Sequence, residues 1–155
     1  EKKSAEMEMA ENGEIIQILE KEHDQVKELF HLFEVEIESN KKRAGTLLNK
    51  IISELKGHTK REERIVYPSL KKLDEDLFFE AHEEHHVADL LIAEIKKLPL
   101  DDDFLAAKVK VLQENIEHHI EEEQSQMFKE LESLSESELS KMAMEWKKAK
   151  QAKAA

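Results

Sequence analysis

Hydrophobic residues recur every three or four positions along most of the chain, which is the spacing of one face of an α-helix. No segment shows the strict alternation that is typical of a half-buried strand. The pattern predicts a first helix from Glu14 to about Ile37, a second from about Arg43 to near Pro68, a third from Asp74 to about Leu98, a fourth from Asp101 through Met127, and a short fifth from Ser135.

The connections between these helices are short, so consecutive helices should be antiparallel neighbours. We expect an all-α fold, an up-down-up-down antiparallel four-helix bundle with a short additional C-terminal helix. Leu139, Met142 and Trp146 share one face of that last helix, which should dock on the bundle. The predicted organisation is a flexible N-terminus over residues 1–11, the bundle over 12–134, and a C-terminal helix with a basic tail over 135–155.

Composition narrows the function classes. The 155 residues include 36 acidic and 24 basic side chains, eight His and no Cys. A net charge of −12 argues against a nucleic-acid partner, and no apolar run is long enough for a membrane span. The missing Cys excludes thiolate metal sites. We expect a cytoplasmic protein, as a monomer or weak homo-oligomer.

The histidines follow the helical pattern. At about 100° per residue, each long helix points one His into the bundle: His23, His58, His85 and His119. Glu62 and Glu123 follow the second and fourth of these at i+4, on the same inward faces. One inward His is usually a hydrogen-bonded core residue. Six such groups would leave several buried polar atoms unpaired, at ~1–3 kcal/mol each, and a bound cation would remove that cost.

The same spacing occurs twice. His58 and Glu62 lie 61 positions before His119 and Glu123, and His23 lies 62 before His85. Such a duplicated hairpin suits two metal ions bridged by carboxylates, because six donors are too many for one tetrahedral ion. Imidazole and carboxylate suit iron, zinc or manganese. Two octahedral ions would keep roughly two positions open for O2, NO or peroxide.

Two aromatic residues also occupy equivalent places in the repeat. Tyr67 lies nine residues after His58, and Phe128 lies nine after His119. In a continuous α-helix this spacing directs both rings away from the candidate site, so we expect both to be packing residues.

Four motifs link the chain to a known family: His23-Asp24, His58-Thr-Lys-Arg-Glu62-Glu63 running into Tyr67-Pro68, Glu84-His85-His86, and His118-His119-Ile-Glu-Glu-Glu123 running into Met127-Phe128. Over about residues 14–128 the chain resembles the hemerythrin-like (HHE cation-binding) family. The resemblance implies a four-helix bundle with a non-haem di-iron centre. By the family pattern, His23, His58, His85 and His119 are terminal ligands, and Glu62 and Glu123 bridge two Fe ions.

The chain departs from the oxygen-carrying branch of this family. Ala81 stands where the carriers have a further His in the third helix, and their later carboxylate is an Asp at a longer spacing. The resemblance is therefore closer to bacterial HHE proteins associated with iron handling or with responses to peroxide, oxygen or nitric oxide.

A second register, meaning an alternative assignment of the metal ligands, uses other histidines. His82 and His86 form a His-x-x-x-His pair, and His118 has the carrier-like spacing to Glu123. His82 could also join the first set as a fifth nitrogen. Otherwise we expect His86 and His118 at the bundle edge or next to the metal ligands. His31 is expected at the surface, and Glu63, Glu121 and Glu122 are expected to be solvated.

Two functions follow from the candidate site. The first is a di-iron protein that binds or reacts with a small oxidant, with peroxide- or NO-related oxidoreductase activity left open because no general acid stands out. The alternative is a non-enzymatic metal-binding or iron-handling module, in which Zn or Mn could replace Fe. A purely helical interaction protein would not explain six inward donors.

Overall fold

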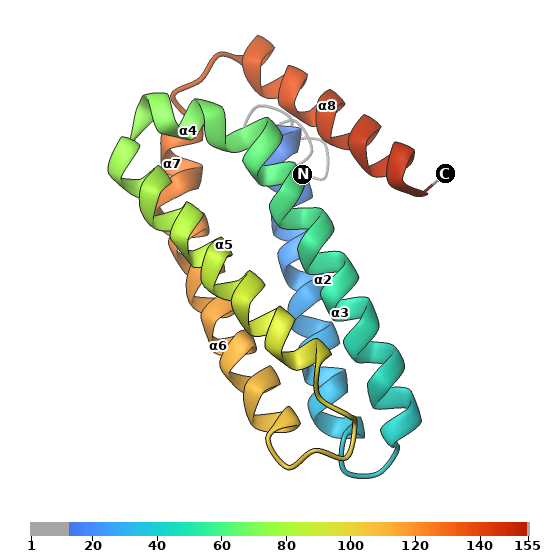
Figure 1. Ribbon diagram of the computed structural model, residues 1–155. Coiled ribbons are helices and arrows are strands. Elements are labelled where there is room, and N and C mark those ends of the chain that lie inside the picture. Colours follow the sequence, from blue (N-terminus) through green and yellow to red (C-terminus); the bar gives the residue numbers. More distant parts are fainter. Residues whose placement is uncertain (1–12, 155) are drawn as a thin grey trace, which may run out of the picture.

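The computed structural model describes residues 13–154, and side chains up to residue 152; the predicted flexible segment 1–11 lies outside the described residues. The elements are α2 (Glu14–Glu36), α3 (Lys41–Arg61), η1 (Glu62–Val66), α4 (Tyr67–Leu73), α5 (Glu75–Lys96), α6 (Leu105–Glu122), η2 (Glu123–Met127), α7 (Phe128–Leu131) and α8 (Glu136–Ala154). Figure 1 shows α2, α3, α5 and α6 side by side, with α8 lying across one end. The predicted all-α fold, a four-helix bundle with an additional C-terminal helix, is confirmed.

Side-chain caps set several of the boundaries. Asp74 and Ser135 each accept a backbone hydrogen bond at a helix start, as predicted, from Leu77 and Glu138. Two starts differ from the prediction. Asn40 caps α3, which therefore begins at Lys41 rather than Arg43. The fourth long helix begins at Leu105, because the Asp102 side chain accepts a hydrogen bond from the amide of Phe104 within a run of turns.

Each of two long helices contains one π-helical turn, η1 and η2. In these turns the amides of Tyr67 and Phe128 bond to the carbonyls five residues earlier, at Glu62 and Glu123. The wider turn adds one residue to the helix and so rotates everything beyond it by about 100°. The second helix therefore continues through Pro68 to Leu73 with a changed phase.

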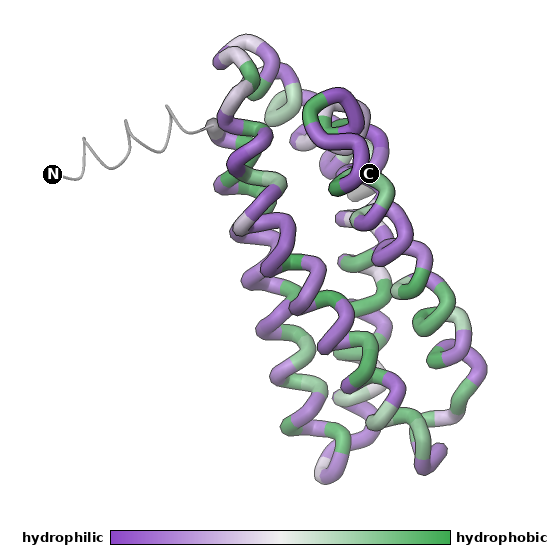
Figure 2. The backbone as a smooth tube through the Cα atoms, turned by 90° about the vertical axis from the view of Figure 1, so that its left-hand side faces the viewer, coloured by the Kyte–Doolittle hydropathy of each residue, from purple (hydrophilic) through white to green (hydrophobic). Residues whose placement is uncertain are grey.

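The bundle interior is layered along its length. One apolar cluster fills the end near the α2–α3 and α5–α6 connections, and its fully buried members include Ile51 and Leu112. A second cluster fills the end covered by α8 and is built around Tyr67, Leu70 and Trp146. Buried His and Glu side chains from all four long helices lie between these clusters. Figure 2 shows that hydrophobic positions recur along helices that are otherwise largely hydrophilic.

The C-terminal helix docks as predicted. Leu139, Met142 and Trp146 of α8 are buried in the second apolar cluster, and Lys147 forms an ion pair with Glu14 of α2. Within residues 13–154, no helix combines the length and the apolar character that crossing a bilayer requires.

The layered core predicts where truncation is costly. We expect Leu112→Ala to lower the free energy of unfolding by roughly 2–5 kcal/mol, because Leu112 is fully buried and its loss leaves a cavity. Leu90→Ala is the matched control, since Leu90 is 54% exposed and should change stability by less than about 0.5 kcal/mol. Urea unfolding measures both variants, and equal losses would contradict this description of the core.

Candidate metal centre

Six polar side chains meet in the layer between the apolar clusters. They are His23 from α2, His58 from α3, Glu62 from η1, His85 from α5, His119 from α6 and Glu123 from η2. All are buried, with at most 7% of any residue exposed. Their donor atoms form two groups, each with its members within 4.8 Å of one another. One contains His23, His58, Glu62 and Glu123, and the other Glu62, His85, His119 and Glu123.

The two carboxylates connect the groups. Oε1 of Glu62 lies 3.2 Å from Nε2 of His58 and 3.3 Å from Nε2 of His85. Oε1 of Glu123 lies 3.3 Å from Nε2 of both His23 and His119. Each carboxylate therefore faces, through Oε1, one imidazole from each group.

The outward nitrogen of every imidazole has its own partner. Nδ1 donates to an oxygen of Gln124 in His23, of Glu22 in His58, of Glu63 in His85 and of Glu84 in His119, at 2.8–3.2 Å. Such bonds fix the ring orientation and, in a neutral ring, the tautomer, as they do in metal sites. They leave Nε2 of all four rings directed into the layer.

The inward nitrogen and oxygen atoms of the six side chains have fewer hydrogen-bond partners than the outward Nδ1 atoms. Nε2 of His23 and His58, both carboxylate oxygens of Glu62 and Oε1 of Glu123 are buried without a hydrogen bond. Nε2 of His85 and His119 face each other at 3.0 Å. Unpaired buried polar atoms are costly, and inward lone pairs on nitrogen and oxygen fit a cation between them.

The electrostatics favour positive charge in this layer. Burial lowers the pKa of His58, but the charges of Glu62 and Glu123 and the hydrogen bond to Glu22 outweigh it and raise the pKa to about 10. The pKa values of His85 and His119 are also raised, since nearby carboxylates outweigh their burial. Metal ions would compete with the protons that these carboxylates retain on the rings.

Tyr67 belongs to this centre, and the prediction that it points away was wrong. Its hydroxyl donates to Oε2 of Glu123 at 2.8 Å and lies 3.0 Å from Nε2 of His85. The π turn η1 rotates Tyr67 inward relative to a continuous α-helix, and hydrophobic periodicity gives no sign of that turn. Burial, followed by the charges of Glu62 and Glu123, raises the tyrosine pKa and keeps the hydroxyl protonated.

Phe128 is a packing residue as predicted, but it packs against the centre rather than away from it. Its ring stacks on His23, with centroids 6.3 Å apart and planes 5° apart. Tyr67 stacks on His85 in the same way, at 5.1 Å. The two halves of the repeat thus place a phenol beside one group of donors and a phenyl ring beside the other.

Glu22 links the centre to the C-terminal helix, and the sequence analysis missed it. One oxygen accepts from Nδ1 of His58 and from Arg61, each at 2.9 Å. The other accepts from the indole N–H of Trp146 at 2.7 Å and from Lys150 at 3.1 Å. Trp146 also lies edge-on to His58, with ring centroids 5.5 Å apart. Helix α8 therefore helps to hold His58 in place.

The histidines of the second register lie elsewhere. His82, His86 and His118 are exposed, as is His31. Glu121 is exposed as expected. Glu63 is not simply solvated, because it accepts the Nδ1–H of His85.

Glu122 was also expected to be solvated, yet it is half-buried. It forms a further group with His118 and Glu84 on the outer side of α5 and α6. Burial and the charges of Glu84 and Glu80 raise its pKa to about 7.

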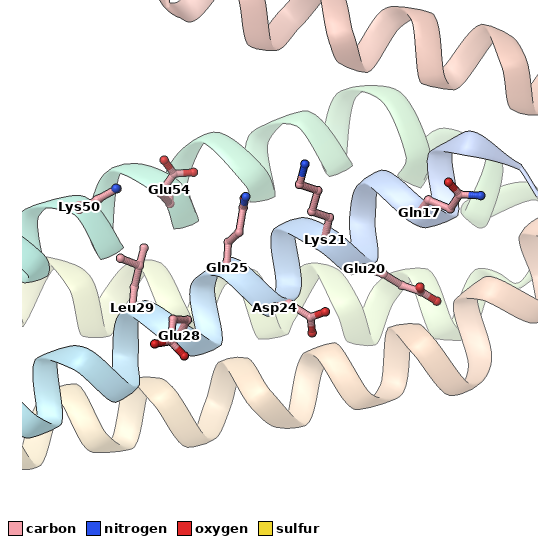
Figure 3. A pocket seen from close by; sticks show the side chains of 9 residues that line it. All are labelled: Gln17, Glu20, Lys21, Asp24, Gln25, Glu28, Leu29, Lys50 and Glu54. Atoms are coloured by element: carbon pink, nitrogen blue, oxygen red, sulfur yellow. The ribbon is translucent and has the colours of Figure 1, made fainter. Parts of the chain in front are cut away.

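Space at the centre is small. A cavity of about 10 Å³ beside His23, His58 and His119 is bounded by Val26, Leu55 and other apolar side chains, and it is near the smallest volume that holds one water. The hollow in Figure 3 is separate. It lies on the surface over α2 and α3 and is lined mainly by charged side chains, including Asp24, none of which belongs to the six.

Comparison with known families gives a match over most of this structure. The model of the hemerythrin HHE cation-binding domain matches residues 14–131, from the start of α2 to the end of α7. The chain belongs to the hemerythrin HHE cation-binding family. No curated protein and no solved structure matches the chain. The buried His and Glu groups of this HHE domain are a metal-binding site by the family match and by their donor chemistry, and α8 lies beyond the matched residues.

The bond between α8 and the HHE domain can be measured by a double-mutant cycle. We expect Trp146→Phe and Glu22→Gln to be coupled by about 0.5–3 kcal/mol in the free energy of unfolding, since the first removes the indole donor and the second removes the charge of its acceptor. Urea unfolding of the two single variants and the double variant gives this energy. Additive effects would show that the bond contributes nothing to stability.

Proposed function

We propose that this protein holds a carboxylate-bridged, non-haem di-iron centre that binds or reacts with a small oxidant: O2, peroxide or NO. The proposed terminal ligands are His23, His58, His85 and His119, through Nε2. Glu62 and Glu123 are the proposed bridges. His82, His86 and His118 are not included in this set.

The sharing of two carboxylates between two four-donor groups carries the proposal. A mononuclear site would need only one of the groups and would leave buried donors of the other unpaired. The Nδ1 bonds of all four rings support the same conclusion, because they aim four Nε2 lone pairs at the positions between the carboxylates. Imidazole with carboxylate suits iron, and it also accepts zinc or manganese.

Bound iron would supply redox chemistry and open coordination positions; the protein supplies the surroundings. The small cavity beside His23, His58 and His119 is bounded largely by apolar side chains, which favours a small ligand over an organic substrate. The Tyr67 hydroxyl, which stays protonated, is a hydrogen-bond donor beside His85 and His119. It is the proposed group that would donate a hydrogen bond to a ligand on that side, in place of its bond to Glu123.

The ligand set predicts the iron content. After anaerobic loading, elemental analysis should give about two iron ions per chain, since the six residues form two four-donor groups that share the two carboxylates. His85→Ala should lose at least one of these ions. His86→Ala is the adjacent control and should keep both, because His86 is exposed. One ion or none in the unmutated protein would contradict a dinuclear centre, and loss of iron from His86→Ala alone would favour the second register.

Reactivity is tested separately from iron content. We expect anaerobic titration of the ferrous protein with O2, NO or peroxide to change its near-ultraviolet absorption in proportion to the iron present, because two octahedral ions held by these six residues would keep open coordination positions. Tyr67→Phe should retain iron and alter the rate or extent of the change. An iron-loaded protein that responds to none of the three would instead support the alternative function, a non-enzymatic metal-binding or iron-handling module.

A further inference from the structure

A second group of metal-binding side chains lies on the outer side of α5 and α6. Nε2 of His118 lies 3.2 Å from Oε1 of Glu122 and 3.8 Å from Oε2 of Glu84. One donor atom from each of the three residues lies within 4.8 Å of the others. The side chains of Glu84 and Glu122 are 15% and 19% exposed, whereas that of His118 is 64% exposed. The two glutamates of the group are therefore mostly buried, and its histidine is open to solvent.

The internal repeat shows what this group lacks. Glu22 and Glu84 are equivalent, 62 positions apart, and each accepts the Nδ1–H of an inward histidine. The charge of Glu22 is offset by Arg61 and by Lys150 of α8. The residue equivalent to Arg61 is Glu122, 61 positions later. Where one half pairs a carboxylate with a guanidinium, the other half brings two carboxylates together.

This difference brings two carboxylates together with only the imidazoles of His118 and His119 to offset their charge. Oε2 of Glu122 is buried and has no hydrogen-bond partner, and Glu80 is a further carboxylate whose charge acts on Glu122. Like charges this close repel, and desolvation adds to the cost. A divalent cation between Glu84 and Glu122 would compensate Glu84 as Arg61 and Lys150 compensate Glu22. A histidine nitrogen with two carboxylates suits a first-row divalent transition metal such as Zn²⁺.

We propose that Glu84, His118 and Glu122 bind a third divalent metal ion at the surface of the bundle. The site is separate from the proposed dinuclear centre, but Glu84 connects the two. Its Oε1 accepts from Nδ1 of His119 at 2.8 Å, while its Oε2 faces His118. The inference rests on the proposed function only in this connection, since the three surface donors include none of the six inward ones.

Titration of the iron-loaded 155-residue chain with Zn²⁺ tests the proposal. Isothermal titration calorimetry with elemental analysis should show about one Zn²⁺ bound per chain with no release of iron. His118→Ala and Glu122→Gln should each weaken Zn²⁺ binding at least about tenfold, because each removes one of three donors. Both variants should keep the iron content of the unmutated protein, since neither side chain contributes to the inward groups.

His82→Ala and Glu121→Gln are the matched controls, because both remove exposed groups of the same types on the same two helices. Both should bind Zn²⁺ as the unmutated protein does. The proposal is overturned if no Zn²⁺ binds, if Zn²⁺ binds only by displacing iron, or if binding survives in both His118→Ala and Glu122→Gln. These results leave the dinuclear centre untouched, whereas an iron content below two would count against the proposed function and not against this site.

Discussion

Two glutamates buried among four histidines impose the main constraint on this structure. Neither carboxylate has enough hydrogen-bond donors to stay charged at low cost in an apolar bundle. Each imidazole, in turn, is held by an outward bond that prevents it from rotating to satisfy itself elsewhere. The layer is therefore a set of converging nitrogen and oxygen donor atoms between two apolar clusters. The apolar clusters stabilise the fold. The buried unpaired atoms of the layer reduce that stability, and a bound cation would offset the loss.

The architecture and the six inward residues could be predicted because both depend on helical phase. Hydrophobic spacing gives the inward face of each helix, and His23, His58, His85 and His119 lie on those faces before any irregularity in their helices. Tyr67 could not be placed in this way. It follows the π turn η1, whose extra residue rotates the helix beyond it, and neither composition nor periodicity signals a turn that bonds five residues back.

The residues that orient the imidazoles were also missed, although the repeat carried a signal for them. Glu22 and Glu84 each directly precede an inward histidine, while Glu63 and Gln124 each directly follow an inward glutamate. Both pairs recur at the same 61–62-residue offset as the inward residues. Acidic side chains are so common in this chain that a single acidic position is uninformative. A polar residue that occurs at equivalent positions in both halves of the repeat is informative. The contact of α8 with Glu22 was beyond such reasoning, because α8 has no counterpart in the repeat.

The chain contains one tryptophan, and its position makes its fluorescence sensitive to the buried layer and to α8. Trp146 is fully buried, lies edge-on to His58 at 5.5 Å, and has the guanidinium of Arg61 over its ring at 5.1 Å. Its fluorescence therefore comes from a single environment next to the buried layer. A transition-metal ion bound by His58 would be expected to quench this indole emission, and undocking of α8 would move the emission to longer wavelength. The protein thus contains a label-free reporter that distinguishes occupancy of the centre from release of its C-terminal helix.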